Sequence, residues 1–292
     1  MKTTLKLFSL FIMFLAISGC SDDDEETQAA FAVTAITPTS GTVGTEITIT
    51  GTNFPDDASQ ISLSFDGVPA SIISVSSTRI VTTVPNGAST GEVSIAANGI
   101  TKAAPTSFTV LSEVISGTMI NLPAPQTGGQ GEPEGGPFAK FSFETGDVTD
   151  SETAWDIAFR GTSIAINGGT VTGTADEPER KGNAGVAIEN GTFTDITSAG
   201  GLTFTQDSDG AYAIPAGSDN GWYNYNPATF IITPIPGRIL VIRTHDGKYA
   251  KVEILSYYRD APADPDAFAD ESRVYTFKYV YNPNDGETSL AE

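Results

Sequence analysis

The protein has 292 residues and a formal net charge of −21, from 36 acidic and 15 basic side chains. Such a charge repels the phosphates of nucleic acids and anionic lipid headgroups, so neither is an expected partner of the protein surface. The single cysteine excludes an intramolecular disulfide, and 30 glycines and 17 prolines among short runs of Thr, Val and Ile favour an all-β chain.

Residues 1–19 have the features of a signal peptide for export. They begin with two lysines, continue with an apolar core at 7–17, and end in small residues before Cys20. The core is too short to cross a ~30 Å hydrocarbon layer as a helix. Because Ile-Ser-Gly-Cys at 17–20 resembles a bacterial lipobox, we expect lipid attachment at Cys20. The alternative is an ordinary signal peptide whose cleavage site contains a cysteine.

Residues 20–30 are expected to form an acidic tether. The run Ser-Asp-Asp-Asp-Glu-Glu at 21–26 has no apolar side chain to bury, so it should be solvated. It is either a spacer or, by resemblance, an export signal that moves lipoproteins to the outer face of the outer membrane. We therefore expect localisation at the outer membrane, facing the cell exterior, with acyl chains as the only membrane contact.

Residues 31–111 are expected to form a first domain, a β-sandwich. Polar and apolar residues alternate at 46–50 and at 60–65, as in strands with one buried face. Turn signals such as Asp66-Gly67 and Asn86-Gly87 separate these runs. Six or seven short strands in a segment of about 80 residues predict an immunoglobulin-like fold.

This segment also resembles a known domain family. The matching pieces are Ile-Thr-Pro-Thr-Ser-Gly at 36–41, Ile-Thr-Ile-Thr-Gly-Thr-Asn-Phe at 47–54, Phe-Asp-Gly at 65–67 and Thr-Gly-Glu-Val-Ser-Ile at 90–95. They resemble the IPT/TIG domain, an immunoglobulin-like module of surface receptors and glycan-handling proteins. The resemblance implies no catalytic residues and places Phe54 against the core. Whether the module is a spacer or binds a partner remains open.

Residues 112–292 are expected to form a second, larger all-β domain. Strand-like runs occur at 112–122, 139–143, 154–159, 238–243, 249–258 and 274–281. Residues 123–137 hold five glycines and four prolines and are predicted to lie outside any sheet. Asp246-Gly247 predicts a tight hairpin between the fourth and fifth runs. In the last run, alternation places Tyr275, Phe277, Tyr279 and Tyr281 on one face.

The second region resembles the HmuY family of haem-binding surface lipoproteins. The pieces that carry the resemblance are Trp-Asp-Ile-Ala-Phe at 155–159, Trp-Tyr-Asn-Tyr at 222–225, the segment 241–252 and the strand-like run 275–281. The resemblance covers residues 114–282. It implies an all-β domain with an apolar haem cleft between loops, in which paired axial His or paired axial Met ligands hold the iron.

The donor side chains depart from that family pattern. The chain after the leader has one histidine, His245, and one methionine, Met119, so neither pair of ligands can form within one chain. His245 is either a ligand or an exposed hairpin residue, and Met119 is either a ligand or a residue that fills a core gap. The remaining candidates are aromatic residues that could bind or stack on a haem, stack on a sugar face or fill a core: Tyr212, Trp222, Tyr223 and Tyr225.

Calcium binding and enzyme activity are two further kinds of chemistry to consider for this sequence. The carboxylates of Asp264, Asp266 and Asp270 could bind calcium, but their spacing is not that of an EF-hand, and a solvated loop is the alternative. With one histidine in a turn and no free thiol, we expect no enzyme activity. The sequence thus predicts a surface lipoprotein that binds haem or a related tetrapyrrole for uptake. The alternative is a glycan- or protein-binding module that has lost haem ligation.

Overall fold

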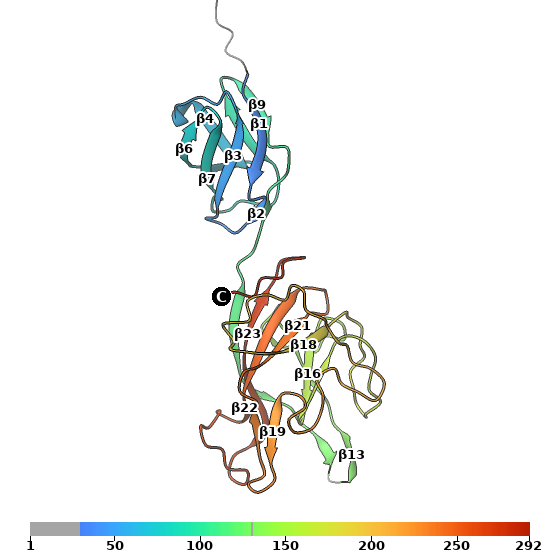
Figure 1. The fold of residues 1–292 in the computed structure, drawn as a ribbon. Coiled ribbons are helices and arrows are strands. Elements are labelled where there is room, and N and C mark those ends of the chain that lie inside the picture. Colours follow the sequence, from blue (N-terminus) through green and yellow to red (C-terminus); the bar gives the residue numbers. More distant parts are fainter. Residues whose placement is uncertain (1–29, 130) are drawn as a thin grey trace, which may run out of the picture.

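The computed structural model describes residues 30–129 and 131–292 (Figure 1). The chain is all-β, as predicted, and its one described helix is the short 3₁₀ turn η1 (Ala58–Gln60). Within these two stretches, no helix has the length and apolarity needed to cross a membrane. The predicted signal peptide, the lipid site Cys20 and the acidic tether up to residue 29 lie outside the described residues.

The first part of the chain is a sandwich of two antiparallel four-stranded sheets, in the orders β1-β3-β7-β6 and β5-β4-β8-β9. A further two-stranded parallel sheet, β2–β10, pairs a strand near the start of this part of the chain with a strand near its end. The strands are β1 (Ala32–Thr37), β2 (Ser40–Gly41), β3 (Glu46–Thr52), β4 (Ile61–Phe65), β5 (Val68–Ala70), β6 (Ile72–Ser76), β7 (Arg79–Thr83), β8 (Val93–Ala97), β9 (Ile100–Ala103) and β10 (Thr109–Val110). The immunoglobulin-like architecture is confirmed, although the segment has ten strands and not six or seven.

The core of this sandwich follows from the alternation in β3. Ile47 and Ile49 point inward and are fully buried, while Glu46 and Thr50, on the other face of the strand, are exposed. Phe54 is 3% exposed and packs in the same core, as the sequence predicted. Gly51 leaves room for it, because a Cβ at this position would lie 2.4 Å from the Phe54 ring.

The second part of the chain holds a five-stranded sheet, β11-β23-β22-β21-β18, and a four-stranded sheet, β15-β14-β16-β17, both antiparallel. Two short ribbons, β12–β13 and β19–β20, accompany them. The strands are β11 (Ile115–Pro123), β12 (Thr127–Gly129), β13 (Glu132–Gly135), β14 (Ala139–Ser142), β15 (Asp147–Val148), β16 (Ile157–Arg160), β17 (Ser163–Ile166), β18 (Gly185–Asn190), β19 (Tyr223–Asn226), β20 (Ile231–Pro234), β21 (Arg238–Arg243), β22 (Tyr249–Tyr258) and β23 (Ser272–Asn282). The domain boundary at 111/112 remains a prediction.

The main core of this part lies between the two larger sheets. Tyr275, Phe277, Tyr279 and Tyr281 share one face of β23 and enter this core, as predicted from their spacing. Val280, on the other face, packs in a smaller cluster behind the five-stranded sheet. Both faces of that sheet are therefore covered, which explains why the four inner positions of β21 are all apolar and buried.

The prediction that residues 123–137 carry no sheet is wrong. They form the ribbon β12–β13, which pairs only with itself and joins neither larger sheet. Gly128 and Gly129 both have positive φ angles, 69° and 91°, at the register shift between Thr127 and Gly129 in β12. The prolines are tolerated because a two-stranded ribbon consists only of edge strands.

The two ends of the five-stranded sheet carry different loops. The predicted hairpin at 244–248 connects β21 to β22 at one end, where Ile115 pairs with Tyr281. At the other end, Pro123 pairs with Val274, and the loop 259–271 joins β22 to β23. We call this second end the distal end; the ribbon β19–β20 also lies there (Figure 1).

Candidate ligand-binding site

A cleft of about 510 Å³ lies at the distal end, between the ribbon β19–β20 and the loop 259–271. Its volume falls within the roughly 300–1,000 Å³ that is typical of small-molecule sites. We call it the distal cleft and define it by nine residues: Asn224, Tyr225, Asn226, Thr229, Ile231, Thr233, Ala263, Asp264 and Pro265. None of them is a histidine, methionine or cysteine, so the lining offers hydrogen bonds and no soft metal ligand.

The register of the ribbon explains which side chains meet the cleft. Asn224 pairs with Thr233 and Asn226 pairs with Ile231, so these four residues share one side of the ribbon. Tyr225 also lines the cleft, although its pairing with Ile232 places its side chain on the other side. The cleft-facing side of the ribbon therefore presents two amides and a hydroxyl beside one apolar residue.

The predicted aromatic cluster is divided between core and surface. Trp222 and Tyr223 are 2% and 7% exposed and belong to the main core, where the indole Nε1 of Trp222 donates to the carbonyl of Thr162 at 2.9 Å. Tyr225 is 41% exposed because the ribbon leaves the body of the fold at this point. Of these three candidates, only Tyr225 is accessible to a large ligand.

Two phenylalanines that the sequence reading did not single out are exposed beside the distal cleft. Phe230 and Phe268 are 55% and 86% exposed, and their ring centroids are 5.8 Å apart in an edge-to-face arrangement. Phe230 lies in the turn between β19 and β20 with φ 61°, a conformation that costs a non-glycine residue ~1 kcal/mol or more. The pair connects the two segments that form opposite walls of the cleft.

The three aspartates weighed for calcium do not form a metal site. Asp266 accepts backbone N–H bonds from Phe268 and Ala269, and Asp270 accepts one from Asp266, so these two carboxylates stabilise the turn of their own loop. Asp264 lines the distal cleft. In the described parts of the chain, no group of three or more His, Cys, Asp or Glu side chains could hold a metal ion.

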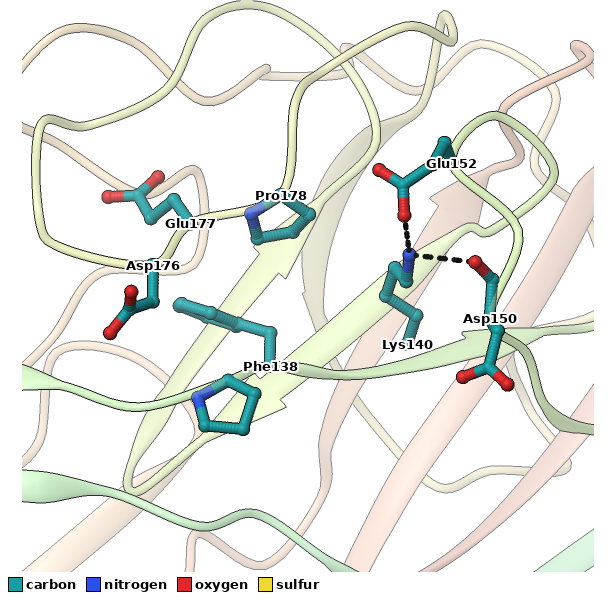
Figure 2. Close-up of a pocket in the computed structure, with 8 residues that line it drawn as sticks. Phe138, Lys140, Asp150, Glu152, Asp176, Glu177 and Pro178 are labelled. Atoms are coloured by element: carbon teal, nitrogen blue, oxygen red, sulfur yellow. Dashed lines mark hydrogen bonds and ion pairs between the residues drawn. The ribbon is translucent and has the colours of Figure 1, made fainter.

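A second cleft of about 710 Å³ lies on the side of the four-stranded sheet, and we call it the lateral cleft (Figure 2). Its lining residues are Pro137, Phe138, Lys140, Asp150, Glu152, Asp176, Glu177 and Pro178. Lys140, the one basic residue among them, is paired with Glu152 at 2.9 Å and also donates to the backbone carbonyl of Asp150. The rim is therefore acidic, and it repels anionic groups such as haem propionates.

The buried side of the lateral cleft rests on a charged network. Arg180 bridges Glu177 and Asp207 at 2.9 Å each, and all three side chains are at most 2% exposed. Burial opposes ionisation of Glu177, but hydrogen bonds from Thr172 and Thr174 outweigh it and lower the Glu177 pKa to about 2. The candidate Tyr212 belongs here: its hydroxyl is 3.3 Å from a Glu177 oxygen, so the phenol is engaged in the network.

His245 is held in place by a residue distant in the sequence. Its Nδ1 is 2.8 Å from Oδ1 of Asp156, and its backbone N–H donates to the same oxygen at 2.9 Å. The side chain is 18% exposed, so the expectation of an exposed hairpin residue is wrong. The hydrogen bond to Asp156 raises the pKa of His245, against the opposing effect of burial.

The remaining candidate, Met119, lies mid-strand on β11 and packs against the main core, as expected of a gap-filling residue. Its strand pairs it with Phe277, whereas His245 lies in the hairpin beyond Arg243 and Tyr249. The fold does not bring the histidine and the methionine together at either cleft. His245 lines neither cleft.

Two family models match the sequence. Residues 32–110 match the IPT/TIG domain, and residues 137–279 match the HmuY protein family. The two matches follow one another in the order that the sequence resemblances predicted, and the HmuY match begins later than the predicted residue 114. No curated protein matches the chain.

Several solved structures are similar to parts of the chain. One is a Bacteroides vulgatus ATCC 8482 protein, named HmuY-like and heme binding (13% identity, 60% of this chain and 97% of that chain, TM-score 0.35). A second is an auxiliary nutrient binding protein from Bacteroides ovatus ATCC 8483 (15% identity, 76% and 67%, TM-score 0.28). A third, from Bacteroides thetaiotaomicron VPI-5482, is named as a phosphatase (18% identity, 76% and 54%, TM-score 0.27). These similarities are too low to support an argument about function.

Proposed function

Because this chain joins an IPT/TIG domain to a domain of the HmuY family, we propose that it is a surface binding protein that captures haem or a related tetrapyrrole without catalysis. Lipid on Cys20 holds it at the outer membrane, facing the cell exterior, and the IPT/TIG domain acts as a spacer. The HmuY domain carries the ligand. The observation that carries the proposal is the family match over residues 137–279.

The donor set of this chain limits how iron could be held. His245 is the one histidine, and its Nδ1 contact with Asp156 is the arrangement that commonly orients a metal-binding imidazole. With Nδ1–H donating to Asp156, Nε2 is the atom that would face the iron. The chain after the leader has no second histidine, and Met119 lies on β11 away from the hairpin of His245, so at most one ligand of the His or Met type is expected.

Haem binding through His245 would depend on pH. The pKa of His245 is raised by Asp156, and a protonated imidazole has no lone pair for iron. Binding therefore releases a proton whenever the free protein holds His245 protonated. We expect haemin affinity to rise with pH up to the raised pKa of His245 and to level off above it.

The test is a haemin titration of residues 21–292, followed by the Soret band in both iron oxidation states. The proposal expects a saturable shift near micromolar concentration that is weakened by His245→Ala. Met119→Leu is the matched control, because it removes the only other soft donor while keeping the apolar volume. Absence of a saturable shift in the unsubstituted protein would end the haem proposal.

The alternative ligand class is a surface glycan, and one observation favours it. The distal cleft is lined by amides and hydroxyls and by no haem-iron ligand of the His, Met or Cys type. Such a lining suits a ligand with many hydroxyl groups better than a porphyrin with two carboxylates.

A further inference from the structure

The distal cleft contains polar side chains that the fold itself does not use. Within residues 30–129 and 131–292, the side chains of Asn224, Thr229, Thr233 and Asp264 form no hydrogen bond with the protein. Other polar side chains of these two segments do form hydrogen bonds with the protein. Asn226 accepts one from the backbone N–H of Ala228, and Asp266 accepts one from the backbone N–H of Phe268. The unused donors and acceptors converge on one concave surface.

The non-polar part of the lining completes a surface of mixed character. Ile231, Ala263 and Pro265 lie among the polar groups on the two walls. A sugar ring has C–H faces that pack on apolar surface and hydroxyl edges that bond to amides, hydroxyls and carboxylates. The Phe268 ring, 86% exposed, comes from the same loop as the lining residues Ala263, Asp264 and Pro265 and contacts Phe230 of the facing ribbon, with at least one face open to solvent.

The charge of the surroundings selects among sugars. Asp264 lines the cleft, and Asp266 and Asp270 lie on the same loop. With a net charge of −21 for the whole chain, this surface repels uronic and sialic acids. The lining of the distal cleft contains no arginine or lysine that could pair with a sugar carboxylate.

The pairing of Phe230 with Phe268 also links the two walls of the cleft before a ligand arrives. Phe230 comes from the ribbon turn and Phe268 from the facing loop, so their contact joins one wall to the other. Both rings are more than half exposed, one of them on a strained backbone, so they present accessible aromatic surface at this point. A preformed cleft loses less entropy on binding than a mobile one.

From these observations we infer that the distal cleft is a binding site for a neutral oligosaccharide. One sugar unit lies in the cleft against Asn224, Thr233 and Asp264, and the next unit stacks on Phe268. The inference rests on the HmuY domain being a binding domain, but it does not depend on haem.

The experiment uses residues 21–292 and a panel of neutral gluco-, manno- and xylo-oligosaccharides of one to six units, with oligogalacturonates as the acidic comparison. Calorimetry should detect binding of at least one neutral series and none of the acidic one. Affinity should rise by about tenfold or more between one and three units, because the second contact is the aromatic ring. If no neutral oligosaccharide binds, the inference is wrong.

Variants then locate the site. Asn224→Ala with Thr233→Ala should abolish binding at every length, while Phe268→Ala should remove the gain with length and weaken the shortest ligand less than the longer ones. Asn190→Ala, an exposed asparagine at the end of β18, is the matched control and should bind as the unsubstituted protein does. Unchanged affinity in the double variant would place the sugar elsewhere and overturn the assignment.

A haemin titration of the same proteins separates this inference from the haem proposal. Haemin binding without sugar binding would overturn the oligosaccharide site alone. Sugar binding that is lost in the double variant, in a protein that does not bind haemin, would overturn the haem proposal and support the oligosaccharide site.

Discussion

Replacing Glu177 by glutamine tests whether the buried network under the lateral cleft stabilises the HmuY domain. The Glu177 carboxylate accepts hydrogen bonds from the backbone of Thr172 and Thr174 and pairs with Arg180 at 2.9 Å. Its pKa falls from 4.5 to about 2, which corresponds to ~3 kcal/mol of folding free energy. Glutamine keeps the shape but leaves the Arg180 charge with Asp207 alone. We expect a loss of ~2–4 kcal/mol at pH 7.

The direction of the pH dependence follows from the lowered pKa. The contribution of Glu177 is fully present above pH 4.5 and is lost as the pH falls through about 2. The difference between the original protein and Glu177→Gln should therefore shrink steadily below pH 4.5. It should be constant between pH 5 and pH 7, because the carboxylate is ionised in both the folded and unfolded states over that range.

Urea unfolding followed by tryptophan fluorescence measures this difference cleanly. The chain has two tryptophans, Trp155 and Trp222, and both are buried in the second part of the chain, so the signal reports that part and not the IPT/TIG domain. Glu152→Gln is the matched control: Glu152 is 66% exposed in its pair with Lys140, so its loss should change the free energy of unfolding much less than the loss of Glu177 does. If Glu177→Gln costs no more than this control, the reasoning about the buried network is refuted.

Three further predictions address the other parts of the account. His245→Gln should flatten the pH dependence of stability above pH 6.5. The raised pKa of His245 gives stability that is present below pH 6.5 and is lost as the pH rises through the raised value. Unfolding midpoints from pH 5 to 8 give the slope, and an unchanged slope would contradict the role of the pair with Asp156. Gly51→Ala should destabilise the IPT/TIG domain by ~1–3 kcal/mol, since its Cβ would overlap the Phe54 ring and the carbonyl of Ala32. Unfolding followed by far-UV circular dichroism should show this loss of stability. Thr50→Ala, at an exposed position of the same strand, is the control. Cys20→Ala should abolish palmitate labelling and release the protein from the membrane fraction; labelling that persists would disprove the lipid site.

Local patterns predicted those parts of the fold that depend on near neighbours. Asp246-Gly247 between two apolar runs predicted the β21–β22 hairpin with its observed strand ends, because a short loop, here residues 244–248, fixes the register of both strands. The alternation from Tyr275 to Tyr281 likewise predicted which side chains enter the core. The ribbon at 127–135 was missed because glycine and proline, which usually interrupt strands, here serve the turn and edges of an isolated hairpin.

The candidate site depended on contacts between distant residues, and the sequence could not supply them. Trp222, Tyr223 and Tyr225 are three aromatic residues within a stretch of four, yet only the departure of the ribbon from the body decides which of them is exposed. The local sequence could not show that His245 is half-buried, because its partner Asp156 lies 89 positions earlier in the chain. Phe230 and Phe268 gave no local signal at all, since their significance arises from the meeting of two loops.

The most direct test of the proposed function is the electron paramagnetic resonance spectrum of the ferric haemin complex of residues 21–292. With His245 as the single protein ligand, the account predicts a high-spin ferric signal that is lost or altered in His245→Ala. A low-spin signal typical of two strong axial ligands, or a spectrum identical to that of free haemin, would contradict it.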